Sequence, residues 1–448
     1  MAQMKAERKW QQEGCAPFLT SWDPSDLPGG SIDPLGFDRG YNALADKILP
    51  GLTNVAAVPR YLGLLCAGAG LGPEPSVADR QAILQRQESV VRLERLWALA
   101  HVLGAEDGGA SASGIRGVTY AEAQRRALQR EGARSTRADF TLLSRQVQYG
   151  AIGIYGNVAH GMRLIDRKTL GLTDDFGERL GTAFLDETGA PKSLLSAVKN
   201  PEEEVGIDVL RAWGRRAHLA APCGPIEATV IGEALQLDTV RARMASALNV
   251  RPPQAGESEL QRLNRIEAYL GKSDQDLAEA IEAVLAYEKC YAWALLVFER
   301  ILWSCSHAGA VSLKDLGSDE HLQRCARAVP GAVTRLGRAL EGTSALDLTK
   351  DQDRFKDVRA FLTELGTCQS GSGMVETVLH RHADVQHGKF DRGRRKLPWV
   401  EVVKGCATLT QVRANQIGRE PTRATDIAPH EYRTHSADAL IKASRGLK

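Results

Sequence analysis

The chain has 448 residues, of which 43% are hydrophobic and 25% charged, and this composition is typical of a globular protein with a sizeable core. Its 57 basic and 55 acidic residues leave a net charge of +2, which excludes neither a polyanionic nor a protein partner. No run reaches the roughly 18 apolar residues of a membrane span, and the charged N-terminus lacks a signal-peptide core. We therefore expect a cytoplasmic protein with no membrane partner.

The first patterned segment covers residues 33–65 and is punctuated by prolines and glycines. Pro34 and Gly36 are expected to turn the chain into a helix of about ten residues, which Pro50 and Gly51 end. Pro59 fits the first turn of the next helix, where its missing N–H costs nothing. The segment is thus interpreted as a rigid helical corner. A second reading makes three of its residues a partner or phosphate contact: Arg39, Arg60 and Tyr61.

Most of the chain after this corner predicts helices, because apolar residues recur at steps of three and four. In residues 79–103, Ile83, Val90, Leu93 and Trp97 form one stripe. From Ser273 a capped helix becomes apolar on more than one side and is expected to be the central helix of its bundle. Further helices are predicted at residues 119–131, 137–149, 173–187, 201–219, 224–248, 256–270, 318–342, 351–366, 371–387 and 436–445.

Strand signals are few, and the clearest is residues 397–413, where β-branched residues and a glycine predict a short hairpin. The expected fold class is therefore mainly α, with multi-helix bundle domains and a small C-terminal β hairpin element. Loops at 104–114 and 252–258 mark boundaries. The predicted domains are an N-terminal helical domain (1–110), a central helical domain (111–250), a helical bundle (251–375) and a basic C-terminal region (376–448). The central domain is a plain helical domain or is winged-helix-like in part, around residues 164–184.

Cofactor and nucleophile motifs are incomplete. A P-loop ending in Gly271, Lys272 and Ser273 would need glycine at the position of Ile266, and the serines at 368–373 lack the spacing of a nucleophile elbow. The eight cysteines are scattered singly, so we expect reduced thiols, with Cys66, Cys290 and Cys305 buried. We predict no catalytic residue, no cofactor and no metal site, and leave open whether any catalysis occurs.

Positive charge gathers at the C-terminal end. From Glu376 to Lys448 there are 14 basic and eight acidic residues, a net charge of +6. Flexible guanidinium groups beside an aromatic ring are typical of phosphate contact and base stacking. The predicted nucleic-acid-binding residues are Arg381, Lys389, Arg392, Arg394, Arg395, Lys396 and Trp399. The enzyme alternative is a metal-dependent nuclease or phosphodiesterase using a histidine set in the same stretch: His380, His382 and His387.

One resemblance to known proteins rests on a series of short motifs. They are "PLGF", "LPGLT" and "RY" of the first segment, followed by "RLERL" at 92–96, "GIRG" at 114–117 and "YGAIGIYG" at 149–156. This block resembles the N-terminal third of uncharacterised bacterial proteins encoded among phage-defence genes. The resemblance implies a genomic setting and supplies no catalytic residue. We expect a non-catalytic subunit of an anti-phage system that associates with DNA or binds other defence-system proteins. A pure protein scaffold is a further alternative.

Overall fold

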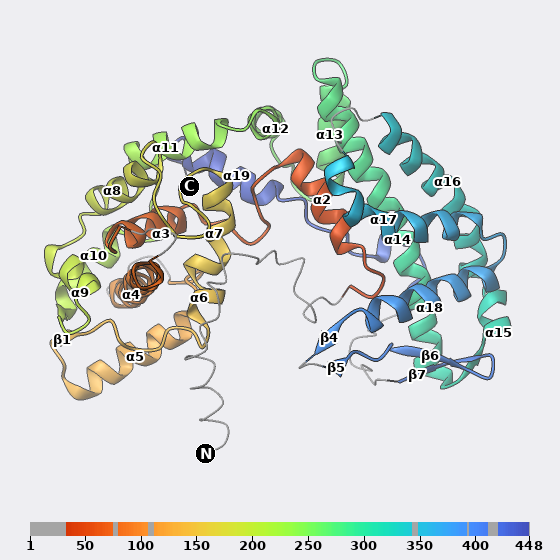
Figure 1. Ribbon diagram of the computed structural model, residues 1–448, viewed down its shortest axis with the longest axis horizontal. Helices are drawn as coiled ribbons and strands as arrows, with labels where there is room; N and C mark the ends of the chain where they lie inside the picture. Colours follow the sequence, from red (N-terminus) through yellow and green to blue (C-terminus); the bar gives the residue numbers. More distant parts are fainter. Residues whose placement is uncertain are drawn as a thin grey trace. The chain divides into compact units, whose positions relative to one another are not determined.

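The computed structural model describes residues 33–74, 79–105, 112–342, 348–391, 394–410 and 420–447 (Figure 1). Helices dominate these residues and strands are short, which confirms the mainly α fold class. The chain forms two compact units. The described residues of unit 1 come from Leu49–Asn249 and Arg433–Lys448, and those of unit 2 come from Asp23–Ile48 and Val250–Tyr432. Of the domain boundaries expected near 110, 250 and 375, only the one at 250 coincides with a boundary between units.

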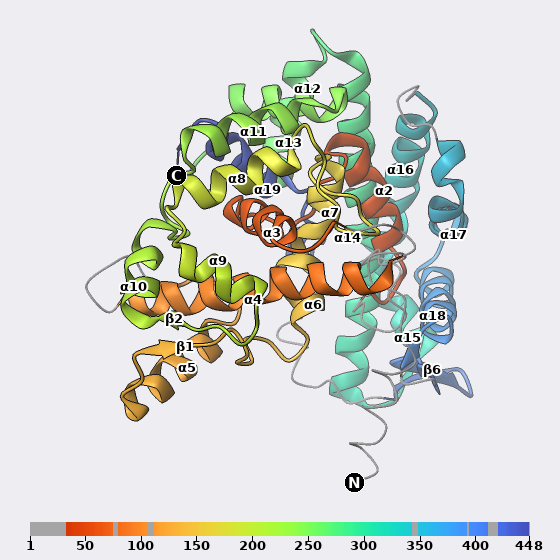
Figure 2. The same ribbon diagram turned by 60° about the vertical axis from the view of Figure 1, so that its left-hand side comes forward.

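Unit 1 is helical with one small sheet. Its elements are α3 (Arg60–Gly70), α4 (Arg80–Ala105), α5 (Val118–Glu131), β1 (Ser135–Thr136), α6 (Gln146–Tyr149), α7 (Ala151–Gly161), α8 (Gly177–Glu187), α9 (Lys192–Lys199), β2 (Val205–Gly206), α10 (Ile207–Arg216), α11 (Pro225–Gln236), α12 (Thr239–Val250) and α19 (Thr434–Ala443). Helix α4, drawn in orange, packs against α3, α5 and α10 (Figure 2). Its Trp97 is fully buried, and the indole Nε1 donates to the Ala217 carbonyl at 2.9 Å.

The turn at Pro50 and Gly51 is held by a buried arginine. Gly51 has a φ of 75°, and a Cβ there would lie 2.9 Å from Gly161 Cα, so only glycine fits. Arg241 Nη1 donates to the carbonyls of Pro50 at 3.0 Å and Gly161 at 3.1 Å. Its other donors bind carbonyls at the end of α11. The turn is therefore a packing device, as predicted.

Three expectations for unit 1 are wrong. Residues 137–149 are not one helix, because only α6 is helical and Arg95 of α4 binds the Ala138 carbonyl at 3.0 Å. The helix expected at 224–248 is divided into α11 and α12, since Asp238 Oδ1 accepts from Arg241 N and caps α12. Residues 164–184 form no winged-helix strands, because only Ile165 and Leu172 pair there as an isolated bridge.

Unit 2 is a helical bundle with short antiparallel strands. Its elements are α2 (Asp38–Ile48), α13 (Glu259–Leu270), α14 (Gln275–Ala308), β3 (Val311–Ser312), α15 (Leu313–Ser318), α16 (Glu320–Gly342), α17 (Leu348–Thr367), α18 (Gly371–His387), β4 (Phe390–Asp391), β5 (Arg394–Arg395), β6 (Val400–Val403), β7 (Cys406–Leu409) and the 3₁₀ helix η4 (Ala424–Asp426). Helix α14 is the central helix, as predicted, because α2, α13, α16 and α18 all pack against it.

The predicted C-terminal hairpin is formed by β6 and β7, which pair antiparallel from Val400–Leu409 to Val403–Cys406. Lys404 and Gly405 connect them with φ values of 52° and 76°, which is the left-handed backbone that a tight two-residue hairpin turn needs. A third strand, β3, extends this sheet on the other side of β7. The β-branched residues and this glycine are the features from which the sequence predicted the hairpin.

Two further expectations concern the cysteines and membrane-spanning helices. Cys66, Cys290 and Cys305 are buried free thiols, as predicted, and burial raises the pKa of each. Within the part of the chain that the structure describes, no helix has both the length and the apolar content to cross a lipid bilayer.

Candidate functional site

The basic and histidine-rich stretch predicted as the functional site begins on α18 and continues into a small hairpin. Ser370 caps α18, with its side chain accepting from Gly373 N. After the helix, β4 and β5 pair antiparallel, with Phe390 opposite Arg395 and Asp391 opposite Arg394. This hairpin is distinct from the one formed by β6 and β7. The stretch therefore divides into a helix-borne part and a hairpin-borne part.

The helix-borne part binds the backbone of residues 33–37, the segment that precedes α2. Arg381 Nε donates to the Leu35 carbonyl at 2.9 Å, and His382 Nδ1 donates to the Pro34 carbonyl at 3.0 Å. Lys389 Nζ donates to the carbonyl of Asp33. From α14, Tyr287 OH donates to the Phe37 carbonyl at 2.7 Å. We call these four side chains, Arg381, His382, Lys389 and Tyr287, the carbonyl clamp.

The same segment also satisfies its own N–H groups. Asp33 Oδ1 accepts from Leu35 N at 3.1 Å and from Gly36 N at 2.8 Å, while Oδ2 accepts from Asp38 N at 2.8 Å. Burial, and next the charge of Asp38, raise the pKa of Asp33. The Phe37 ring is fully buried among aromatic rings of α14 and α17. The carbonyl clamp and Asp33 together hold the backbone of segment 33–37 through hydrogen bonds to both its carbonyl and its N–H groups.

His382 is a structural residue and not a metal ligand. With Nδ1 donating to Pro34, its Nε2 accepts the Trp399 backbone N–H at 2.8 Å. A neutral imidazole has one donor and one acceptor nitrogen, so both are used. The side chain is fully buried, and burial lowers its pKa to about 4. The metal-dependent nuclease alternative therefore lacks His382, one of its three proposed histidine ligands.

The other two histidines of that set, His380 and His387, are exposed on α18. His380 Nδ1 lies 3.8 Å from Asp384 Oδ2, a surface pair one helical turn apart. Among the residues that the structure describes, no three His, Cys, Asp or Glu side chains are grouped so as to hold a metal ion.

Three of the residues predicted to contact phosphate instead make contacts within unit 2. This corrects their assignment as phosphate-binding residues. Arg381 and Lys389 belong to the carbonyl clamp, and burial lowers the pKa of each. The Arg381 guanidinium also lies over the Phe361 ring, 5.5 Å from its centroid. Trp399 is half-buried, with its ring 5.9 Å from that of Phe298 and 5.5 Å from that of His382. Part of its ring therefore packs against two aromatic side chains of unit 2.

In the hairpin-borne part, the structure describes the burial of two of the predicted basic side chains. Arg395 is exposed and Lys396 is half-buried. Lys396 N donates to the Lys389 carbonyl at 2.9 Å, which fixes the base of the hairpin to a clamp residue. Of the other predicted residues, Arg394 is described only in its backbone, and Arg392 lies outside the described residues.

The residues of the first segment separate in the fold. Arg39 is exposed in the first turn of α2, in unit 2. Arg60 is buried in unit 1, where Nη2 donates to the Pro222 carbonyl at 2.6 Å and lies 3.6 Å from Glu227 Oε2. Tyr61 is buried as well, and its OH accepts from Arg116 N at 2.9 Å. Arg60 and Tyr61 are therefore core residues, and the expected partner or phosphate contact is wrong for both.

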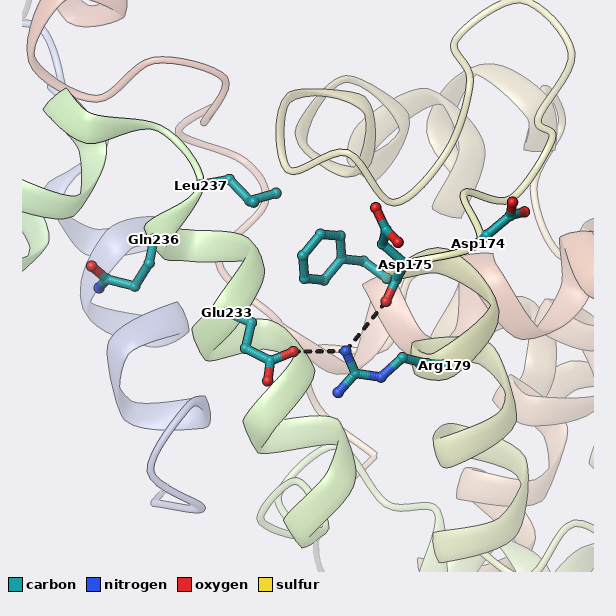
Figure 3. Close-up of a pocket in the computed structure, with 7 residues that line it drawn as sticks. Asp174, Asp175, Arg179, Glu233, Gln236 and Leu237 are labelled. Atoms are coloured by element: carbon teal, nitrogen blue, oxygen red, sulfur yellow. Dashed lines mark hydrogen bonds and ion pairs between the residues drawn. The ribbon is translucent and has the colours of Figure 1, made fainter.

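A pocket of about 640 Å³ lies in unit 1, at α8 and α11, and none of the predicted site residues lines it (Figure 3). Arg179 Nη1 reaches across it to Glu233 Oε2 at 2.8 Å and to the Asp175 carbonyl at 3.3 Å. The remaining lining includes the carboxylates of Asp174 and Asp175. With three carboxylates and one guanidinium, this pocket disfavours phosphate groups.

Comparison with known proteins adds no relative to this geometry. No protein-family model, curated protein or solved structure matches the chain.

Sequence reasoning missed two structural side chains of these sites, Tyr287 and Arg241. Tyr287 follows the apolar residues Ala283–Ala286 of α14, and buried tyrosine hydroxyls usually find a hydrogen-bond partner. That signal was readable, although its partner was not. Arg241 follows Asp238 in an ordinary helix start, and nothing in its neighbourhood marks it as a residue that binds four carbonyls.

Proposed function

We propose that this protein is a non-catalytic, DNA-associated subunit of a bacterial anti-phage defence system, and that it contacts phosphate through the β4–β5 hairpin. The hairpin tip is defined as residues 391–396. It carries four basic residues and one acidic residue. The observation that supports this proposal is the exposed Arg395 on a hairpin whose base is tied to Lys389.

A fixed base and a charged tip suit phosphate contact for two reasons. Guanidinium groups form bidentate hydrogen bonds with phosphate and remain charged at every physiological pH. Such contacts position a protein on the DNA backbone without reading the base sequence. The defence setting rests on the resemblance of the N-terminal third. Other defence-system proteins are the expected partners besides DNA.

Charge reversal at the tip tests this proposal. The variant R392E/R394E/R395E/K396E is compared with the wild type by fluorescence anisotropy on a labelled duplex, at about 50 and 200 mM salt. Loss of four phosphate contacts should reduce the salt dependence, the slope of log K against log salt, by about 3 to 4. The matched control reverses four exposed arginines of unit 1, in R126E/R130E/R134E/R145E, and should leave the slope unchanged.

Unchanged binding by the hairpin variant would contradict the proposal. If the wild type binds no DNA but co-purifies with another protein, the scaffold alternative replaces it. The nuclease alternative requires that the protein cleave the same duplex when a divalent metal ion is present. This cleavage should be lost in H380A/H387A, which removes the two exposed histidines of the proposed set.

A further inference from the structure

Helix α16 of unit 2 has two opposite faces. One face is apolar and buried, and it packs on α14, α17 and α18. Its buried side chains are Leu322, Cys325, Ala326, Val329, Ala332, Leu336 and Leu340. A helix of this kind, with one buried stripe, leaves its other face to solvent.

The solvent face of α16 carries four exposed arginines: Arg324, Arg327, Arg335 and Arg338. At 100° per residue these positions fall within about 80° of one another, directly opposite the buried stripe. The chain contains no carboxylate between His321 and Leu340. The positive charge of this face is therefore not interrupted along the helix. We call these four residues the arginine face.

Among the described residues, two of these four arginines lie within 4 Å of a carboxylate. Arg335 forms a two-pronged ion pair with Glu282 of α14, at 2.7 and 2.8 Å. Arg324 lies 3.9 Å from Glu320 at the helix start, and both side chains are at least half exposed, so water screens this pair. Arg327 donates to the Gln323 carbonyl of its own helix at 3.3 Å. Arg324, Arg327 and Arg338 therefore project positive charge into solvent.

The rest of the same face is small and polar. Gly331 lies between the two arginine pairs, and a Cβ there would have no atom within 4 Å. Thr334 is exposed beside it. None of the large hydrophobic side chains found exposed among the described residues lies on α16. A membrane-surface helix needs exposed apolar side chains to insert between lipids, so this face suits a phosphate backbone better than a bilayer.

We propose that the arginine face of α16 binds the phosphate backbone of a double-stranded nucleic acid. The 14 helical rises from Arg324 to Arg338 span about 21 Å, roughly six base-pair steps along a duplex lying parallel to the helix. Arginine is the side chain whose fork matches phosphate oxygens, and the face contains no lysine. The partner class rests on the proposed function, whereas the surface is separate from the hairpin tip.

The test uses the full chain and a labelled 30-base-pair duplex at two salt concentrations. The variant R324E/R327E/R338E reverses the three arginines that project into solvent. It should bind about tenfold more weakly or worse, with the salt slope reduced by about 2 to 3. R324K/R327K/R338K keeps the charge and should retain most of the slope. R126E/R130E/R134E makes the same change in net charge in the last turns of α5 and just after it, where Glu122 and Glu131 neighbour the arginines, and should bind like the wild type.

The outcomes separate the two proposals. If the α16 variant binds like the wild type while the hairpin variant binds weakly, the arginine face is not a contact surface and the hairpin proposal stands. The reverse result supports the arginine face alone. A wild type that binds no duplex overturns both. Binding to phosphatidylserine vesicles without binding to DNA would assign the face to a membrane instead. Circular dichroism at 222 nm confirms that each variant is folded.

Discussion

At the scale of single residues, His382 shows how one neutral imidazole can join three parts of unit 2. It lies on α18, donates to Pro34 and accepts from the Trp399 backbone. Truncating it would leave a buried carbonyl and a part-buried N–H without their partners, and a fully buried group left in this way costs about 1 to 3 kcal/mol. His101 of α4 in unit 1 binds in the same way, between the Trp97 carbonyl and Leu219 N. Histidine in this role is a backbone connector.

We therefore expect H382A to lower the free energy of unfolding of unit 2 by about 2 to 4 kcal/mol at pH 7. Hydrogen exchange of the backbone N–H groups of residues 35–37 and 399 measures this. The control is H380A, two residues away on the same helix but exposed, which should change the stability by less than about 0.5 kcal/mol. Equal exchange in H382A and the wild type would contradict the clamp.

The same residue gives a pH dependence with a defined sign. Its folded-state pKa of about 4 lies below the ordinary value of 6.5, so the unfolded chain binds the proton more tightly. The stability contributed by neutral His382 is present above pH 6.5 and is lost as the pH falls toward 4. The stability difference between wild type and H382A should therefore narrow by about 2 to 3 kcal/mol between pH 7 and pH 4.5.

At the scale of elements, one turn and the segment 33–37 are each held by side chains from helices that are distant in the sequence. The turn at Pro50 and Gly51 depends on Arg241 of α12, and the segment 33–37 depends on α14, α18 and Lys389. Both have glycines with positive φ, at Gly36 and Gly51. At Gly51 the close approach of Gly161 adds a steric requirement to the conformational one.

Two alanine substitutions in unit 1 separate the steric requirement for glycine from the conformational one. Gly51 and Gly132 have φ values of 75° and 63°, but a Cβ at Gly132 would meet nothing within 4 Å. G132A should therefore cost only the left-handed backbone penalty, about 1 kcal/mol. G51A should cost about 3 kcal/mol or more, because its Cβ would meet Gly161 backbone. Urea unfolding of unit 1 measures both. Similar losses in the two variants would mean that the contact with Gly161 is easily relieved.

At the scale of the whole molecule, each unit takes its described residues from separate parts of the chain. Helix α19 comes from the C-terminal end but belongs to unit 1, where it packs on α11. Ala437, Leu440 and Ile441 of this helix are buried. Ser436 Oγ also donates to the Asn54 carbonyl at 3.2 Å. A chain that ends after Tyr432 would therefore lack part of the core of unit 1 while keeping all of unit 2.

We expect this truncation to destabilise unit 1 by about 4 kcal/mol or more, from the lost burial of three apolar side chains. Hydrogen exchange should increase in α3, α11 and the turn at Pro50, while α14 and α16 keep their protection. The control removes only Leu447 and Lys448, of which Leu447 is exposed, and should have no effect. Equal protection of α11 in the truncated and full chains would show that unit 1 does not need α19.

The sequence by itself determined the helical architecture, because periodic apolar residues are a local signal. The α14 stripe was readable for this reason, and the Pro50–Gly51 corner and the turn at Gly405 were readable because proline and glycine are local turn signals. The arginine face of α16 was not predicted, although helical spacing and the absence of carboxylates between His321 and Leu340 are both local features of the sequence. Tertiary structure alone decided how the basic C-terminal stretch is used. A charge pattern cannot tell whether a guanidinium meets solvent or a carbonyl from 346 residues earlier, as Arg381 meets Leu35. That distinction depends on long-range packing, which also buried Arg60 and Tyr61 and placed α19 in unit 1.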